Sequence, residues 1–381
     1  MSTLVVSEPA HPLPTGWGGG LVDIVSGSFG AGHDAAAQAI ADQLQSSGFQ
    51  TRISDIVDLM PGSRGRALRA AFLYQVQLAP SSYRWMVHYG QQHTRVNAWI
   101  ARAMECAHPA LLRLAADRPA AIISTHPLAS QALGELRTQH RLRSPVTTYL
   151  TDMSVHRVLV HSGVDLHLAW HEVPAAQAVR LGAVTTRVVQ PALPAAKRSS
   201  AGSPPRSQDD CRRALGLPLN RRLVLVTGGS CGIGDLERSA DDIATTGIAT
   251  PVVLCGRNER LRRRLQTFQR SAIALGWVDD MTVLLSAVDV VVQNSGGFTS
   301  LETLSAGVPV VSYRCLSGHG EANADALDQA GLAPWIQTPA GLQDGLRQAL
   351  ATVRTHRWSA AQQVRPGLVE TIFAGSWARS A

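Results

Sequence analysis

The chain has 381 residues, of which 45% are hydrophobic and 17% are charged. This length suits two domains better than one, and the composition excludes a disordered or collagen-like chain. The formal net charge of +7 favours anionic partners such as phosphates, acidic lipid surfaces or nucleic acids, whereas no apolar stretch reaches the roughly 18–20 residues that span a bilayer.

Residues 1–20 are rich in proline and glycine, and no basic segment followed by an apolar block occurs there. We therefore expect a loose leader and not a secretory signal. The five cysteines are odd in number and contain no C-x-x-C pair. This pattern argues against a disulfide scaffold or a zinc ribbon and favours a reducing cytoplasm.

Short apolar runs alternate with helix-like segments along the rest of the chain. The runs lie at 21–26, 51–57, 120–125, 145–150, 222–227, 251–255, 288–292 and 308–313. Runs this apolar are typical of strands buried on both faces of a parallel sheet. The alanine- and leucine-rich segments at 34–45, 300–306 and 322–329 are predicted helices.

Residues 193–210 are rich in proline, serine, alanine and charge, which predicts a linker between two halves. We therefore expect an α/β fold of two doubly wound, Rossmann-like domains facing across a cleft. The N-terminal domain would span 21–192 and the C-terminal domain 211–381. Ligands of such sheets bind beyond the carboxyl ends of the strands, so the loops there are the candidate sites.

The first such loop, at 27–33, has the sequence GSFGAGH and lies between a predicted strand and a predicted helix. Glycines let the backbone approach a ligand, and a helix N-terminus favours negative charge. Many glycine-rich turns bind nothing, but His33 at the tip favours function. An imidazole titrates near neutrality and can accept a proton from a hydroxyl group.

Two further glycine loops follow predicted strands of the second half, at 227–234 (TGGSCGIG) and 294–302 (NSGGFTSLE). The first lacks the spacing of a dinucleotide fingerprint and fits a general diphosphate cradle better. In the second, Glu302 can accept hydrogen bonds from ribose hydroxyls. The competing interpretation is a capping box in which Glu302 pairs with Thr299.

These three loops, in this order, resemble the GT-B glycosyltransferases of family 28. Within that family the resemblance is to the monogalactosyldiacylglycerol synthases and diacylglycerol glucosyltransferases, and more distantly to the peptidoglycan N-acetylglucosaminyltransferase that makes lipid II. Further matching motifs are STHP at 124–127, TD at 151–152 with His156, GVD at 163–165, CGRN at 255–258 and GWVDDM at 276–281.

The resemblance implies a role for individual residues. His33 would activate or orient the acceptor hydroxyl, with Asp152 on the acceptor side. On the donor side, the implied contacts are Gly228, Gly229 and Ser230 with the phosphates, the backbone of Val278 with uracil, Ser295, Gly296 and Thr299 with the phosphates again, Glu302 with the ribose, and Glu321 and Asn323 with the sugar hydroxyls.

The chain departs from the family pattern at two places. Relatives carry lysine or arginine at the position of Asn294, and a Gln-Glu-Glu run where this chain has His319-Gly320-Glu321. The first departure removes a charge near the diphosphate, and the second leaves the identity of the sugar open. Arg257 is either the replacement cation or a solvated arginine at the start of a helix.

Residues 61–118 form a basic aromatic insert, with eight arginines against two acidic residues and six of the 19 aromatic residues. Such a mixture suits an anionic phospholipid surface, single-stranded nucleic acid, or a helical pair with solvated arginines. Because this region faces the membrane in the lipid glycosyltransferases, membrane contact is favoured. The residues expected to make it are Arg64, Arg66, Arg69, Trp85 and Trp99.

The sequence therefore predicts an inverting glycosyltransferase that moves a hexose from a UDP-sugar to a diacylglycerol-like lipid at the cytoplasmic membrane face. The UDP-sugar is a co-substrate, and neither a cofactor nor a metal is expected because no Asp-x-Asp motif lies near the phosphate loops. A soluble secondary-metabolite acceptor is the main alternative. A non-catalytic nucleic-acid-binding protein and a sugar-nucleotide epimerase are weaker ones; we expect no nucleic-acid partner.

Overall fold

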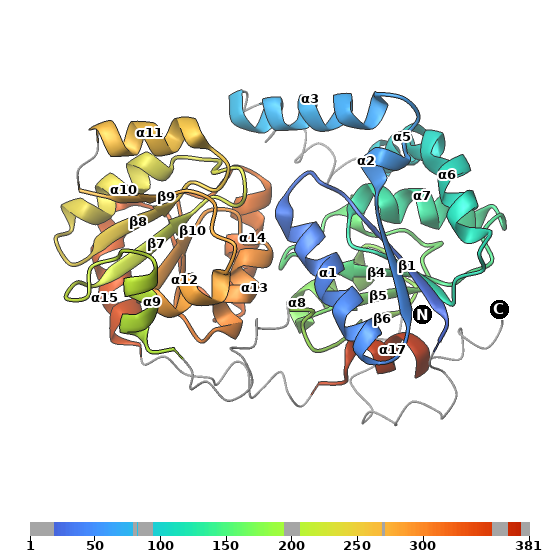
Figure 1. Cartoon of the computed structure of the whole chain (residues 1–381). Coiled ribbons are helices and arrows are strands. Elements are labelled where there is room, and N and C mark those ends of the chain that lie inside the picture. The colour runs from blue at the N-terminus through green and yellow to red at the C-terminus, as the bar shows by residue number, and fades with distance from the viewer. Residues whose placement is uncertain are drawn as a thin grey trace. The chain divides into compact units, whose positions relative to one another are not determined.

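The computed structural model describes residues 19–78, 82, 94–193, 206–268, 271–352 and 365–374. The chain divides into two compact units, which Figure 1 shows in full. The first consists of Met1–Pro194 together with Ala361–Ala381, and the second consists of Ala195–Ala360. Each unit is an α/β domain built on its own parallel sheet.

The sheet of the first unit has six parallel strands in the order β2-β1-β3-β4-β5-β6. Because the order reverses at β1, the loops after β1 and β3 lie side by side at the carboxyl edge, where such sheets bind ligands. The strands are β1 (Leu21–Ser26), β2 (Gln50–Asp55), β3 (Ala121–Ser124), β4 (Val146–Leu150), β5 (Leu166–Ala169) and β6 (Thr186–Val188).

Helices connect and cover these strands. Small alanines on α1 let it pack closely on β1 and β2, whereas α7 and its neighbours share a separate core with Val25 and Ile122. The helices are α1 (Ala31–Ser46), α2 (Ile56–Leu59), α3 (Arg64–Leu78), α5 (Thr94–Met104), α6 (His108–Ala115), α7 (Pro127–Thr138) and α8 (Glu172–Arg180).

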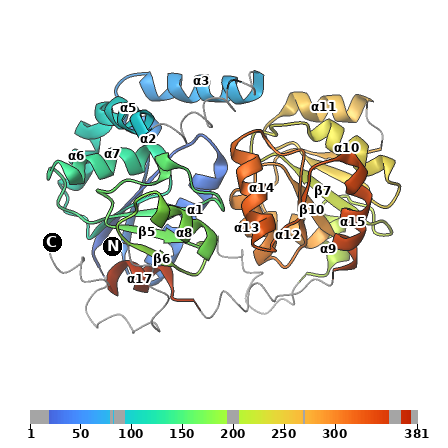
Figure 2. The same ribbon diagram turned by 180° about the vertical axis from the view of Figure 1, so that it is seen from behind.

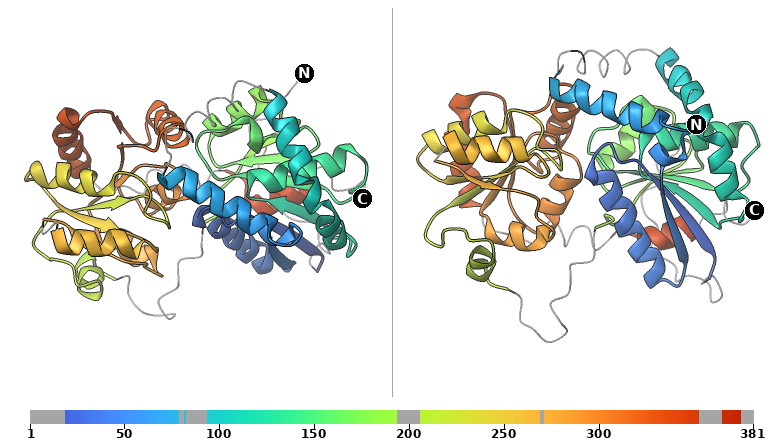
Figure 3. Two further views of the ribbon diagram at one scale, coloured as in Figure 1. Left: turned by 90° about the horizontal axis from the view of Figure 1, so that it is seen from above. Right: turned by 45° about the horizontal axis from the view of Figure 1, so that its top comes forward.

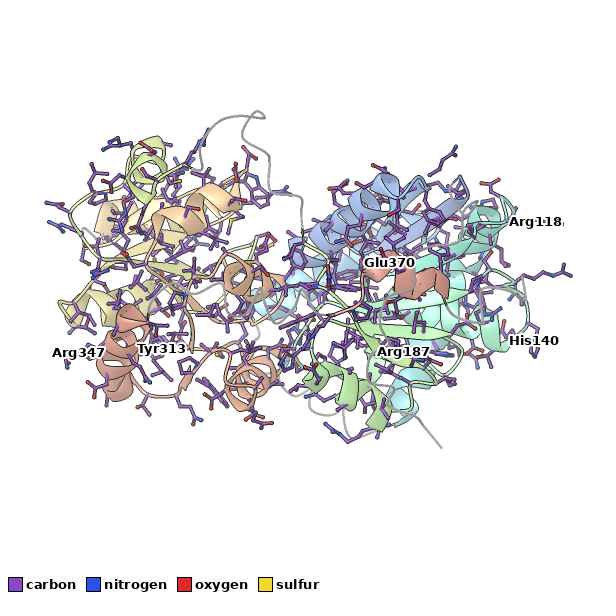
Figure 4. The ribbon with its side chains drawn as sticks, turned by 90° about the horizontal axis from the view of Figure 1, so that it is seen from below. Arg118, His140, Arg187, Tyr313, Arg347 and Glu370 are labelled. Atoms are coloured by element: carbon purple, nitrogen blue, oxygen red, sulfur yellow. The ribbon has the colours of Figure 1, made fainter. Side chains whose placement is uncertain are left out.

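The final helix, α17 (Leu368–Ala374), belongs to the first unit (Figures 1 and 2). Phe373 stacks on Phe49 with ring centroids 4.4 Å apart. The guanidinium of Arg365 binds the Glu172 carboxylate at 2.7 Å, and Glu370, labelled in Figure 4, lies on this helix. The expected C-terminal domain of 211–381 is therefore too long, because apolar burial and an ion pair hold the last segment on the first unit.

The sheet of the second unit also has six parallel strands, in the order β12-β11-β10-β7-β8-β9. The order reverses at β7, so the loops after β7 and β10 are neighbours at the carboxyl edge. The strands are β7 (Leu223–Thr227), β8 (Thr250–Leu254), β9 (Ile273–Leu275), β10 (Val290–Gln293), β11 (Val310–Tyr313) and β12 (Trp335–Ile336).

Two apolar cores lie on the two faces of this sheet. One joins α10, α11 and α15 to the strands, and the other joins α9 and α12. The helices are α9 (Gln208–Ala214), α10 (Leu236–Thr245), α11 (Glu259–Phe268), α12 (Met281–Ala287), α13 (Phe298–Ser305), α14 (His319–Gln329) and α15 (Leu342–Ala351).

The predicted linker is wrong at its C-terminal end. Ser207 caps α9, and its hydroxyl accepts a hydrogen bond from the Asp210 amide at 3.1 Å while the Asp210 carboxylate accepts one in return. This capping box starts a helix inside 193–210. Of the expected linker and leader, residues 194–205 and 1–18 lie outside the described residues.

All eight predicted strands are present, with ends shifted by at most two residues. Four strands were not predicted: β5, β6, β9 and β12. They are two to four residues long, and β6, β9 and β12 are edge strands, so their apolar pattern is too short to stand out. Within the described part of the chain, no helix is long and apolar enough to cross a membrane.

Candidate active site

His33 lies in the first turn of α1, at the carboxyl edge of the first unit's sheet. Its Nδ1 atom is 2.6 Å from the carbonyl oxygen of Thr125, which follows β3. The Thr125 hydroxyl donates a hydrogen bond to the His33 carbonyl at 3.0 Å. Two reciprocal contacts therefore fix the position of His33 against the neighbouring loop.

This contact determines which ring nitrogen of His33 is basic. A carbonyl oxygen only accepts hydrogen bonds, so Nδ1 carries the proton. The lone pair of the neutral ring is then on Nε2, and this atom can accept a proton. The arrangement resembles the use of a carboxylate to orient a catalytic histidine, with a backbone carbonyl in the orienting role.

The loop after β3 also places a second histidine, His126, in contact with His33. The His126 ring is 4.7 Å from that of His33, edge to face, and stacks on Phe29 at 4.9 Å. Burial, with smaller contributions from His33 and His156, lowers the pKa of His126 well below its ordinary value. His126 is therefore neutral at physiological pH. Gly27 has to be glycine, because a Cβ there would lie 2.5 Å from the His126 ring.

Buried hydroxyl groups fix the position of this loop through hydrogen bonds. The Thr148 hydroxyl donates to Ser130 at 2.9 Å, and Ser130 donates to the Ser124 hydroxyl at 2.9 Å. Ser124 in turn donates to the His126 carbonyl at 2.9 Å. This chain of hydrogen bonds links β4, α7 and β3, so the histidine pair sits on a rigid support.

Asp152, expected on the acceptor side, is connected to His33 through its neighbour. The Thr151 hydroxyl is 3.4 Å from His33 Nδ1 and 3.4 Å from the Asp152 carboxylate. Asp152 is buried. The loops after β1, β3 and β4, which are adjacent strands, thus bring His33, Thr125 and Asp152 together at one edge of the sheet.

Helix α3, which is part of the basic aromatic insert, contacts this site. Phe72 on α3 meets Phe29 edge to face at 5.4 Å, and Figure 3 shows α3 on the outside of the first unit. Arg64 and Arg66 are exposed.

Two aromatic side chains of the insert are among the most exposed apolar groups of the described residues: Tyr74 at 65% and Trp99 at 73%. Arg69 is half-buried, and Trp85 lies outside the described residues. The insert therefore carries exposed aromatic and basic side chains together, and its aromatic residues are not confined to a core.

In the second unit, the predicted donor residues lie in loops that follow the strands or in the first two turns of α13 and α14. Gly228, Gly229 and Ser230 follow β7, and a Cβ at Gly228 would lie 2.2 Å from the Ile233 carbonyl oxygen. The Ser230 carbonyl accepts a hydrogen bond from the Arg257 amide at 2.9 Å. The loops after β7 and β8 are thus tied together.

Asn294 ties the loop after β10 to the loop after β7. It is 3% exposed, and its side-chain amide donates to the Ile233 carbonyl at 2.7 Å. Its backbone carbonyl accepts from Leu316 at 2.8 Å. Where relatives are expected to carry a cation, this chain therefore uses a neutral amide that joins three loops.

Glu302 is a half-buried carboxylate without a hydrogen-bond or ion-pair partner among the described residues. Burial raises its pKa to about 7. The capping-box alternative does not describe the structure, because α13 starts after Gly297 and Thr299 lies within its first turn. An unpartnered carboxylate that is costly to bury is typical of a ligand site.

Asn323 and Glu321, expected at the sugar hydroxyls, both make protein contacts. Asn323 is completely buried, and its amide donates to the Ser295 carbonyl at 3.0 Å. Glu321 accepts a hydrogen bond from the Gly318 amide at 2.9 Å. Gly296 has a φ of 72°, and a Cβ there would lie 2.4 Å from Asn323. In this structure Asn323 supports the Ser295–Gly296 loop.

Arg257 is exposed and stacks on Trp277, with its guanidinium carbon 4.5 Å from the ring centroid. Trp277 is 46% exposed, and its ring nitrogen donates to Asp279 at 2.9 Å. Val278 lies between Trp277 and Asp279 in the chain. The guanidinium therefore lies beside the loop expected to bind uracil. The interpretation of Arg257 as a merely solvated arginine does not account for this cation–π contact.

The remaining ionic contacts of this edge are structural. Tyr313, labelled in Figure 4, donates from its hydroxyl to Asp242 at 2.7 Å, and Arg314 binds the same carboxylate at 2.7 Å. Among the residues that the structure describes, no three histidine, cysteine or acidic side chains are grouped so that they could hold a metal ion.

The two units match two protein families. Residues 33–194 match the monogalactosyldiacylglycerol (MGDG) synthase family, and residues 223–366 match the glycosyltransferase family 28 C-terminal domain. The chain is a glycosyltransferase with a C-terminal domain of family 28. Its two six-stranded α/β units are the domains of the GT-B fold. The first family match begins at His33 itself.

Individual proteins are similar to this glycosyltransferase over most of its length. A processive diacylglycerol beta-glucosyltransferase of Bacillus cereus is 25% identical and covers 85% of this chain and 86% of its own. That of Bacillus pumilus is 22% identical, with coverage of 81% for both chains.

Solved structures share the fold. The spinosyn rhamnosyltransferase SpnG with thymidine diphosphate has a TM-score of 0.57, 14% identity and coverage of 92% and 99%. MurG of Acinetobacter baumannii has a TM-score of 0.53, 16% identity and coverage of 93% and 97%.

Three site residues of this glycosyltransferase were not assigned a role from sequence. The Thr125 carbonyl orients His33, and Phe29 packs on His126. Gln293 accepts a hydrogen bond from the Gly296 amide and donates to Ser312 at 2.6 Å. The STHP motif at the end of an apolar run was the available signal for Thr125. A backbone acceptor leaves no other trace in a sequence.

Proposed function

We propose that the protein is an inverting glycosyltransferase that moves a hexose from a UDP-sugar to a hydroxyl group of a diacylglycerol-like lipid. The observation that carries the proposal is the contact between His33 Nδ1 and the Thr125 carbonyl oxygen at 2.6 Å. It makes Nε2 of His33 the basic nitrogen, as deprotonation of an alcohol requires.

In the proposed reaction, His33 Nε2 takes the proton of the acceptor hydroxyl while its oxygen attacks the anomeric carbon. The bond from that carbon to the diphosphate oxygen breaks, and UDP leaves. This single displacement inverts the configuration. The backbone amides of the glycine loops before α10 and α13 stabilise the negative charge on the departing diphosphate.

Glu302 supports the donor half of the proposal. Its carboxylate lacks a protein partner among the described residues, and ribose hydroxyls would supply hydrogen-bond donors to it. Arg257 stacks on Trp277, the residue before Val278, where the base would bind. We propose that the backbone amides and these side chains are sufficient and that neither a metal nor another cofactor is used.

A lipid acceptor is supported by the relatives, which are named diacylglycerol glucosyltransferases and align over most of the chain. The match of the first unit to the MGDG synthase family agrees with this. Exposed Tyr74 and Trp99 beside exposed arginines suit an anionic membrane surface. We place the enzyme there as a peripheral protein on the cytoplasmic face.

A panel of UDP- and dTDP-sugars, assayed by mass spectrometry with diacylglycerol in anionic vesicles, tests this proposal. We expect a glycosylated lipid from a UDP-hexose, with the anomeric configuration opposite to that of the donor. Glycosylation of soluble alcohols but of no lipid would support the secondary-metabolite alternative. Tight binding of single-stranded nucleic acid without binding of any sugar nucleotide would overturn the proposal.

A further inference from the structure

Helix α11 presents an unusual combination of charge and exposed apolar surface on the second unit. Its sequence, ERLRRRLQTF, holds four arginines and one glutamate. Leu261 and Leu265 are buried, and α11 packs by this side against the sheet at β9. Figure 3 shows the helix on the outside of its unit. Of the remaining side chains of α11, Arg262 is half-buried and the others are exposed.

The four arginines of α11 fall into two classes. Arg262 pairs with Glu259 at 3.3 Å, and Arg264 pairs with Glu237 at 2.6 Å. Arg260 and Arg263 are exposed and have no ion-pair partner among the described residues. They are three positions apart, so they lie on one side of the helix. Two uncompensated positive charges thus face solvent together.

Phe268 ends the same helix and is 83% exposed, the highest value for any large apolar side chain of the described residues. Exposing an aromatic ring to water is unfavourable, and burying the ring against a partner surface would lower the free energy. Thr267, next to it, is also exposed. An apolar ring at the end of a cationic helix is the combination found at phospholipid interfaces.

We propose that Arg260, Arg263 and Phe268 form a second membrane-docking surface, which binds anionic phospholipid headgroups and inserts one aromatic ring. The inference rests on the membrane association proposed above and extends it from the first unit to the second. Charge complementarity selects the partner: two unpaired guanidinium groups bind lipid phosphates, and the ring enters the layer beneath them.

This surface lies beside the candidate donor site in the chain. Helix α11 starts directly after Arg257 and Asn258, and the Asn258 side chain accepts a hydrogen bond from the Leu261 amide at 3.0 Å. Arg257 in turn stacks on Trp277. A contact of α11 with lipid would therefore act on the helix that directly follows this part of the candidate donor site.

The test is sedimentation of the full-length protein with two kinds of vesicle, pure phosphatidylcholine and an equimolar mixture with phosphatidylglycerol. The double variant R260Q/R263Q removes the unpaired charges. R213Q/R347Q is the matched control, since Arg213 and Arg347 are both 59% exposed on other helices of the same unit. Arg347 is labelled in Figure 4.

We expect R260Q/R263Q to bind the mixed vesicles about tenfold or more weakly, since each basic residue at an anionic surface is worth about fivefold. The control variant should lose much less. F268A should reduce the part of the binding that high salt does not remove. UDP affinity should stay unchanged in all three variants.

Equal binding by R260Q/R263Q and R213Q/R347Q would overturn the proposal that α11 binds the membrane. The membrane association of the first unit would still stand if charge reversal on α3 reduced binding. A wild-type protein that ignores anionic vesicles would overturn both. Loss of single-stranded oligonucleotide binding in R260Q/R263Q, with vesicle binding intact, would show that the surface serves nucleic acid instead.

Discussion

The Nδ1 atom of His33 lies 2.6 Å from the carbonyl oxygen of Thr125, although the two residues follow different strands. The sheet enforces this proximity, because β1 and β3 are paired in parallel with Val25 opposite Ser124. A backbone carbonyl cannot be removed by substitution. The orientation of the His33 ring is therefore a property of the fold and tolerates changes in the Thr125 side chain.

Replacing His33 by alanine should lower turnover by about 10²–10⁴, the usual contribution of a positioned general base. Donor affinity should change little, because His33 belongs to the first unit and the predicted donor residues belong to the second. Steady-state kinetics and calorimetry with UDP separate the two effects. Near-normal turnover in H33A would remove His33 from the mechanism.

T125V is the matched control for His33. It removes the hydroxyl that binds the His33 carbonyl but keeps the backbone carbonyl that binds Nδ1. We expect it to lose less than tenfold in turnover, with a small drop in melting temperature from one lost hydrogen bond of about 1 kcal/mol. A loss as large as that of H33A would mean that the hydroxyl is what positions His33.

Glu302 should make UDP binding dependent on pH. Its pKa is raised to about 7 by burial, and ribose hydroxyls bind the ionised form better, so UDP affinity should rise with pH until the carboxyl group is ionised. Calorimetry across this range tests the idea. The UDP phosphate also titrates, so E302Q is the control: the pH dependence should become shallower and the affinity lower by roughly tenfold.

The same group predicts how stability varies with pH. The pKa of Glu302 rises from 4.5 to about 7 on folding, so between these values the folded state binds more protons than the unfolded state. Its contribution to stability therefore falls as pH rises through this window. Without ligand, E302Q should match the wild type below pH 4.5 and melt at a higher temperature above pH 7. A lower melting temperature at every pH would indicate a structural role.

Reversing the charges of Arg64, Arg66 and Arg69 on α3 should weaken binding to anionic vesicles and lower activity on a lipid acceptor. Each basic residue near such a surface contributes about 1 kcal/mol, and salt screens this within about 8–10 Å. Binding should therefore weaken as salt rises. The part that remains should depend on the exposed ring of Trp99 and on Trp85, which W99A and W85A test separately.

The control for α3 is R141E/R143E/R180E, which makes the same change in net charge at three exposed positions elsewhere in the first unit. It should retain most vesicle binding, and UDP affinity should be unchanged in both triple variants. An equal loss in the control would mean that overall charge, and not the position of α3, drives the association.

Asn294 should be needed for the geometry of the donor loops. Replacing it by alanine leaves the half-buried Ile233 carbonyl without its 2.7 Å donor, which costs about 1 kcal/mol of stability. N294A should therefore melt earlier and bind UDP more weakly. N294K introduces the residue type expected in relatives, at a place where a Cβ on Gly234 would lie only 2.3 Å from the Asn294 side-chain nitrogen. A gain in UDP affinity for N294K would show that a cation is tolerated there.

Activity should withstand chelation. In the proposed mechanism, the amides of the loops before α10 and α13 stabilise the diphosphate, so EDTA in excess should leave the initial rate unchanged. Turnover that disappears with EDTA and returns with Mg²⁺ would contradict the absence of a metal.

The positions of the site loops were predictable because they depend on local features. Each candidate loop follows a long apolar run, and parallel sheets place such loops at one edge. The tertiary partners were not predictable. The contact of His33 with Thr125 involves a carbonyl that every residue has, and Asn323 looks like a polar ligand in sequence while the fold buries it completely.

The capping-box interpretation of Glu302 shows the same limit. The Thr-x-x-Glu spacing at 299–302 fits the motif, but the motif requires that the threonine precede the helix. Gly297 precedes it instead, and the helix starts at Phe298. Two residues of shift at a helix start are within the usual uncertainty of sequence patterns, and here they turn a capping carboxylate into an unpartnered one.

The stacking of Phe373 on Phe49 has a consequence for how the chain is made and divided. The first unit is built from two segments of chain that flank the second unit, so during synthesis it stays incomplete until α17 has left the ribosome. The second unit, by contrast, is continuous and can fold earlier. A fragment cut after residue 194 would expose Phe49 and leave Glu172 without Arg365, so only a circularly permuted or split design that restores 365–374 would keep the first unit whole.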